Sequence, residues 1–256
     1  MIVKPDSLLV EGLHPSPNIG VRRDGCRPPL LLMHYTGMES AAKAIDWLAR
    51  PESSVSCHYV IDDTGLITQM VPEAARAWHA GASHWAGETD INSVSIGIEI
   101  QNPGHSQGYP EFPKEQMHAI AALSRDIVAR HGMRPESVLA HSDVSPGRKI
   151  DPGEKFDWAW LARVGVGHWT EPAPVNSDEL GSSFGDEGAH IAEVQALLRR
   201  YGYDVETHGW LDEKTQTVLR AFQLHFRPAR ADGRLDTSTY DTLRRLVAAL
   251  PAAVVG

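Results

Sequence analysis

Short apolar runs and one strict alternation predict β-strands in the N-terminal two thirds of the chain. The run LLLMHYTG at 30–37 is apolar up to a polar end, which is typical of a buried central strand. Apolar residues flank a DTG turn in the segment 57–72, which predicts a hairpin. In SVSIGIEIQN at 93–102 the isoleucines share one face and Glu99 lies on the other. The segment 137–144 predicts a last strand that leads into a loop.

Other segments of the same part have apolar residues at helical spacing. Segments 40–51, 112–132 and 156–165 each place apolar residues close to one face. Ser40 is suited to cap the first of these helices, and Gly132 is suited to end the second. Three helices between strands are enough to cover a sheet.

Two segments of this part show neither the strand pattern nor the helix pattern. Residues 1–29 are rich in proline and glycine, so we expect an irregular lead-in. ARAWHAG at 75–81 is expected to form a loop. Because strands and helices are otherwise interspersed, we predict an α/β domain with a mixed central β-sheet flanked by helices.

The pattern changes after residue 168 and becomes purely helical. We predict a catalytic domain at 1–168, a polar linker rich in proline and glycine at 169–186, and a small three-helix domain at 187–256. Within the last domain, GWLDEKT at 209–215 and GRLDTST at 233–239 repeat one pattern. The aspartate of each repeat is suited to cap the helix that follows.

Composition limits the classes of protein that fit the chain. Its 256 residues suit one large or two smaller domains. A net charge of −9 does not favour binding to nucleic acid or to an anionic membrane surface. Two cysteines are too few for a disulfide framework. No apolar run is long enough for a membrane span or a signal peptide, so we expect a cytoplasmic protein, or one of the periplasm or cell envelope if a leader was removed.

One loop, AHSDVSPGRKIDP at 140–152, concentrates groups that bind metals. His141 and Asp151 lie near its two ends, and His34 ends another predicted strand. Parallel neighbouring strands bring such ends together, so these three residues could form one site. Two histidines and a carboxylate with an open fourth position suit a hydrolytic zinc ion, Zn²⁺. The spacing alone leaves this site a hypothesis.

Glu99 and Lys149 are candidates for acid–base chemistry beside such a metal. A carboxylate in the middle of a strand either faces water or faces a polar site. Metal-assisted amide hydrolysis needs a base for the water proton and a donor for the developing oxyanion. Glu99 could be the base and Lys149 the donor. Without a metal site, both would be ordinary surface charges.

Four blocks of the chain resemble a known family, in that family's order. These blocks are HYTG, SCHYVIDDTGLITQMVPEAARAWHAG, SIGIEIQN and AHSDVSPGRKIDPG. They are similar to the zinc-dependent N-acetylmuramoyl-L-alanine amidases of the AmpD and AmiD type, and also to phage lysozyme-type amidases and peptidoglycan recognition proteins. The C-terminal helical domain looks like a peptidoglycan-binding domain. The resemblance implies zinc ligands at His34, His141 and Asp151 and a catalytic pair at Glu99 and Lys149.

The implied substrate is the amide bond between N-acetylmuramic acid and L-alanine in peptidoglycan or muropeptides. Trp78, His79 and Arg148 are candidate substrate contacts, although a loop anchored by Trp78 and a surface Arg148 are alternatives. A non-catalytic recognition protein and a phage-type lytic enzyme remain alternatives to a turnover enzyme. We expect removal of 187–256 to weaken binding to the wall and to spare cleavage of soluble muropeptides. The sequence does not predict the oligomeric state.

Overall fold

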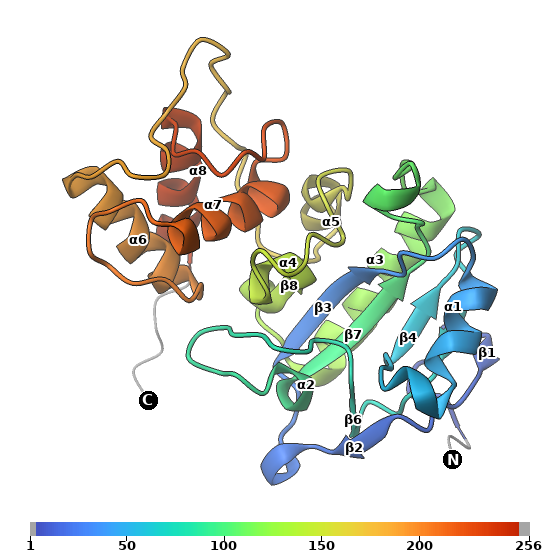
Figure 1. The fold of residues 1–256 in the computed structure, drawn as a ribbon. Helices are drawn as coiled ribbons and strands as arrows, with labels where there is room; N and C mark the ends of the chain where they lie inside the picture. The colour runs from blue at the N-terminus through green and yellow to red at the C-terminus, as the bar shows by residue number, and fades with distance from the viewer. Residues whose placement is uncertain (1–3, 251–256) are drawn as a thin grey trace.

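A mixed six-stranded sheet forms the centre of the N-terminal part of the chain (Figure 1). The computed structural model describes residues 4–250. Neighbouring strands are parallel except for the hairpin pair β4 and β5, which confirms the mixed sheet. In spatial order the strands are β1 (Gly12–Leu13), β5 (Ile67–Gln69), β4 (Tyr59–Ile61), β7 (Ser95–Ile100), β3 (Leu30–Tyr35) and β8 (Val138–Ala140).

The two faces of this sheet are covered differently. On one face, the isoleucines of β7 pack in a core cluster that includes apolar residues of α3 (Lys114–His131) and α5 (Trp158–Arg163). On the other face, α1 (Ala41–Leu48) packs beside β4. Alternation along β3 and β7 places His34 and Glu99 on this second face. The polar residues of the strands therefore lie on the face that carries α1.

Helix ends agree with the expected capping residues. The Ser40 side chain accepts a hydrogen bond from the amide of Lys43 at the start of α1. Gly132 ends α3 with a positive φ of 65°, a conformation that glycine adopts without steric cost. The hairpin of β4 and β5 is also confirmed.

The expected irregular segments contain three short strands. β2 (Ile19–Val21) and β6 (Ala75–Ala77) form a separate two-stranded antiparallel sheet, and β1 extends the main sheet at its edge. The predictions of an irregular lead-in and of a loop at 75–81 were therefore wrong at these positions. Strands of two or three residues are too short for alternation to be visible, and only pairing with a distant segment defines them.

Three helices form the C-terminal part, as predicted: α6 (Ala189–Tyr201), α7 (Glu213–Phe226) and α8 (Thr237–Ala248). Asp212 and Asp236 cap α7 and α8 by accepting hydrogen bonds from backbone amides, each at 2.7 Å. The repeated pattern in the sequence therefore marks two equivalent helix starts. Of the helices in residues 4–250, none has the length and hydropathy that crossing a membrane requires.

The apolar core of this helical module continues into the catalytic part. One cluster joins residues of all three module helices to strand β3 and to the segments around Trp85 and Val144. The indole of Trp85 lies so close to Gly202 that a Cβ there would be 2.5 Å from the ring. The module is thus packed against the catalytic part through a shared core.

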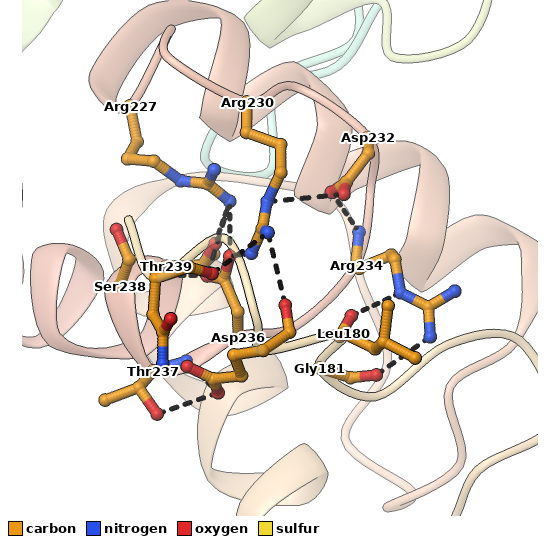
Figure 2. Close-up of polar contacts among 12 residues, drawn as sticks. Leu180, Gly181, Arg227, Arg230, Asp232, Arg234, Asp236, Thr237, Ser238 and Thr239 are labelled. Atoms are coloured by element: carbon orange, nitrogen blue, oxygen red, sulfur yellow. Dashed lines mark hydrogen bonds and ion pairs between the residues drawn. The ribbon is translucent and has the colours of Figure 1, made fainter. Parts of the chain in front are cut away.

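The segment that joins the two parts has no helix or long strand but is fixed to the module. Arg230 donates to the carbonyl of Glu179, and Arg234 donates to the carbonyls of Leu180 and Gly181 (Figure 2). Isolated bridges also pair 182 with 235 and 187 with 210. These contacts hold the segment along the module surface.

Candidate active site

His34, His141 and Asp151 come together where β3 and β8 end. The two strands are parallel, and Met33 pairs with Ala140, so the histidines that follow lie side by side. The Nδ1 atoms of His34 and His141 are 2.9 Å apart. Asp151 Oδ2 lies 2.9 Å from Nδ1 of His141 and 3.4 Å from Nδ1 of His34. All three side chains are buried.

This triangle of ligand atoms fits a small tetrahedral cation. Ligands at about 2.0–2.1 Å from a tetrahedral zinc ion lie roughly 3.3 Å from one another. The three observed separations of 2.9, 2.9 and 3.4 Å bracket that value. The donor set of two imidazoles and one carboxylate is also one that Zn²⁺ accepts in hydrolytic sites.

Hydrogen bonds behind His34 determine which of its nitrogens is unprotonated. The Ser95 hydroxyl donates to the Ile91 carbonyl at 2.6 Å, so its oxygen is free to accept from His79 Nε2 at 3.2 Å. His79 Nδ1 then accepts from His34 Nε2 at 3.0 Å. This chain leaves the lone pair of His34 Nδ1 directed toward the ligand triangle.

His141 is oriented in the same way by a backbone group. Its Nε2 donates to the Ala80 carbonyl at 3.2 Å, which leaves Nδ1 unprotonated. Two imidazole lone pairs and a carboxylate oxygen therefore converge without a proton between them. A cation at their centre would relieve the repulsion among these three donors.

Burial and neighbouring charges together decide the protonation states of the candidate ligands. Burial and the neighbouring His141 lower the pKa of His34 to about 4, so its imidazole is neutral near pH 7. Burial alone would raise the pKa of Asp151, whereas the positive charge of a protonated His141, or of a cation in place of that proton, lowers this pKa below its usual range. The pair is thus a neutral histidine beside an ionised carboxylate.

Glu99 faces this ligand group from the neighbouring strand. β7 is parallel to β3, and Glu99 is in register with His34. Its Oε2 is shielded from solvent and has no hydrogen-bond partner among residues 4–250. Burial, and then the charge of Asp151, raise the pKa of Glu99 to about 8, while Lys149 opposes the shift. A cation on the ligands would lower that pKa again.

Lys149 and the candidate substrate contacts line a cavity of about 460 Å³ beside the ligands. Trp78 is half-buried in its wall, where Trp47 supplies a second aromatic side chain. The guanidinium of Arg148 donates to the carbonyls of Ala80 and Ala82, so much of its hydrogen-bonding capacity is used within the protein.

His79 lies behind His34, where both of its ring nitrogens have partners in the protein. Its backbone amide, together with that of Ala80, donates to the side chain of Asn92. Sequence reasoning identified neither Ser95 nor Asn92, because no motif marks them. Their roles follow only from which side chains face His79 in the fold.

Two protein families match the chain in separate regions. A family described as N-acetylmuramoyl-L-alanine amidase matches residues 24–154, and a family of peptidoglycan binding domains matches residues 187–243. The amidase AmiD of Escherichia coli is 36% identical over 83% of this chain and 80% of that protein. The 1,6-anhydro-N-acetylmuramyl-L-alanine amidase AmpD of Salmonella typhimurium is 32% identical over 56% of this chain and 84% of that protein.

Two solved structures share both the fold and the extent of the chain. AmiD from E. coli, in complex with anhydro-N-acetylmuramic acid-L-Ala-D-gamma-Glu-L-Lys, superposes with a TM-score of 0.74 and 34% identity, covering 87% of this chain and 90% of that one. AmpDh3 from Pseudomonas aeruginosa, in complex with anhydromuramic pentapeptide, superposes with a TM-score of 0.75 and 32% identity. The match covers 89% of this chain and 94% of that one.

Proposed function

Because the chain belongs to the N-acetylmuramoyl-L-alanine amidase family, we propose that it cleaves its substrate with a zinc ion held by His34, His141 and Asp151. The reaction is hydrolysis of the amide bond between N-acetylmuramic acid and L-alanine. The observation that carries the zinc proposal is the convergence of two imidazole nitrogens and one carboxylate oxygen beside Glu99, whose shielded Oε2 has no hydrogen-bond partner in the described part of the chain.

A zinc ion in this site supplies acidification of a water molecule and polarisation of the substrate carbonyl. Glu99 lines the cavity beside the ligands, and its Oε2 has no hydrogen-bond partner within residues 4–250, so in this proposal it accepts the proton of the attacking water. The ammonium of Lys149 lies close enough to lower the pKa of both Glu99 and His34. In this proposal Lys149 donates a hydrogen bond to the developing oxyanion. It then transfers a proton to the leaving nitrogen.

The substrates that we propose are muropeptides and polymeric peptidoglycan. AmiD and AmpDh3 have been solved with anhydromuramyl peptides bound, which supports a muramyl peptide in the cavity beside the ligands. Trp78 and Trp47 present aromatic surface that can cover a sugar ring or an apolar part of the stem. The match of the C-terminal module to a peptidoglycan binding family supports a role in holding the polymer.

The test combines zinc content with mass analysis of a muropeptide digest. We expect stoichiometric zinc and release of a free peptide stem from the wild type, and neither from His141→Ala. His118→Ala, which changes an exposed histidine of α3, should behave as wild type.

The alternative is a recognition protein that binds peptidoglycan without cutting it. Zinc binding and peptidoglycan binding without any release of stem peptide would favour that alternative. Cleavage that persists after zinc is removed and in His141→Ala would contradict the metal mechanism itself. The candidate set is complete, with three metal ligands, a base at Glu99 and a positively charged donor at Lys149. This supports an enzyme over a recognition protein.

A further inference from the structure

A carboxylate directly behind the metal ligands is bound by the C-terminal module. Asp143 belongs to α4 (His141–Val144), the single turn that begins with the ligand His141, and it is 1% exposed. Its oxygens accept hydrogen bonds from the Ala140 amide at 2.8 Å, the Tyr203 hydroxyl at 2.5 Å and His225 Nδ1 at 2.6 Å. Two of these three donors come from the module.

Both module donors are held firmly by packing. Tyr203 follows the end of α6 and is 1% exposed, and its ring lies 4.9 Å from that of Trp85. His225 is in the last turn of α7, and its ring stacks on Trp158 of the catalytic part with centroids 3.8 Å apart. Both side chains are buried, so neither can replace its hydrogen bond to Asp143 with one to water.

Asp143 is connected to both ends of the metal-binding loop through the backbone. It binds the amide of Ala140, the residue before His141. In the same turn, the Ser142 amide donates to the backbone carbonyl of the ligand Asp151 at 3.0 Å. A shift of this turn therefore changes the positions of His141 and Asp151 together.

A second contact presses α7 against the same loop. At Gly147, a Cβ atom would lie 2.6 Å from the Thr217 methyl group, so the loop backbone touches the helix directly. The module thus contacts this loop at two places, Asp143 and Gly147. Without it, the buried carboxylate of Asp143 would lose two of its three partners, which is costly for a charged group.

We propose that Tyr203 and His225 are positioning residues for the metal site, and that the module completes the metal-binding turn in addition to binding the wall. This inference rests on the proposed zinc site. Partners one shell outside the ligands typically change metal affinity or activity by 10–100-fold when they are removed. Tyr203 and His225 do not touch a ligand and act on the ligands through Asp143. We therefore expect effects at the lower end of that range.

The experiment compares zinc affinity of full-length variants by competition with a chromophoric chelator. Tyr203→Phe keeps the ring and removes only the hydroxyl, and we expect zinc affinity to fall roughly tenfold. His225→Leu should lose at least as much, while His225→Asn, whose amide can replace the Nδ1 donor, should recover part of the loss. The visible absorption spectrum of cobalt-substituted protein should change in Tyr203→Phe, because the ligands shift.

Tyr240→Phe is the matched control. Tyr240 is also a module tyrosine that donates to a carboxylate, Glu193 at 2.8 Å, but this pair lies outside the contact with α4. Its zinc affinity and cobalt spectrum should equal those of the wild type.

Tyr203→Phe decides the question even if His225→Leu fails to fold. Zinc affinity in Tyr203→Phe within twofold of wild type, with an unchanged cobalt spectrum, would overturn the inference and leave the zinc site intact. A wild-type protein that binds no zinc would overturn the zinc site, and the inference with it.

Discussion

The tautomer of His34 depends on a side chain that it touches, His79. Because Ser95 can only accept from His79 Nε2, His79 Nδ1 can only accept from His34. We expect His79→Leu to lower zinc affinity by roughly 10–100-fold, since it leaves the Nε2–H of His34 without a partner. His79→Gln can accept and donate at once, so it should retain more affinity than His79→Leu.

Zinc competition titrations of the two variants measure this effect. His14→Leu, at an exposed histidine, is the control and should bind zinc as the wild type does. Equal affinity for wild type and His79→Leu would show that His79 does not orient His34.

Glu99 has the environment of a general base. We expect Glu99→Gln to fold and to bind zinc, and to lose about 10²–10⁴-fold in kcat, the range for removal of a general base. Release of stem peptide from a soluble muropeptide measures the rate. Glu115→Gln removes an exposed carboxylate of α3 and should leave the rate unchanged. A fully active Glu99→Gln would exclude Glu99 from the proton transfer.

The same variant tests the raised pKa of Glu99. In the metal-free protein this pKa is about 8, above the value of about 4.3 for an unfolded chain. The folded state therefore binds the proton more tightly, and this contribution to stability is lost as the pH rises from about 4.3 through 8. Urea midpoints of metal-free protein should fall more between pH 5 and pH 8 for wild type than for Glu99→Gln. Parallel pH dependence in the two proteins would contradict the shift.

Residue types and strand ends were enough to predict which side chains meet, and the resemblance to the amidase family supplied their roles, which stay predictions. His34 and His141 could be placed together because each lies at the end of an apolar strand, and Glu99 because it lies on the polar face of an alternating strand. The partners of His79 could not be predicted in the same way. A buried imidazole bonds to whatever the fold places beside it, and Ser95 is sixteen positions away in sequence.

At the scale of elements, the two repeated helix starts of the module have the same cap but different surroundings. Asp212 caps α7 and is partly exposed, whereas Asp236 caps α8 and is buried against Arg227 and Arg230 (Figure 2). Removing a cap costs about 1 kcal/mol, while leaving a buried ion without its partner costs about 3 kcal/mol or more. Asp236→Ala should therefore destabilise the protein much more than Asp212→Ala.

Denaturant unfolding of the two alanine variants measures this difference. Asp236→Asn keeps the capping oxygen and removes the charge, so its stability should lie between those of wild type and Asp236→Ala. Equal losses in Asp212→Ala and Asp236→Ala would mean that the ion pairs with Arg227 and Arg230 contribute nothing beyond the cap.

Long or capped elements were predictable from sequence, and short paired ones were not. The helix α3 has eighteen residues with a glycine at its end, and its apolar positions are fixed by local spacing alone. The strands β2 and β6 have three residues each and exist only because they pair across more than fifty positions. Local patterns carry no information on such pairing.

At the scale of the whole molecule, the catalytic part and the module share one apolar core. Trp85 packs against Tyr203 and against the backbone of Gly202. The expectation that 187–256 can be removed without loss of activity treated the module as a separate unit. The shared core argues against that expectation, because deletion would expose these apolar surfaces and free Asp143.

Such a core predicts that zinc bound to the strand ends also stabilises the helices of the module. Zinc at a hundred times its Kd stabilises the folded state by about 2.7 kcal/mol. If both parts unfold together, the slowest-exchanging amides of β3 and of α7 should both slow by about a hundredfold in hydrogen exchange. In His34→Ala, which lacks a ligand, added zinc should slow neither. The free energy of zinc binding slows exchange only at amides that open in the same unfolding event as the metal site. Slower exchange in β3 with unchanged exchange in α7 would therefore show that the module unfolds on its own.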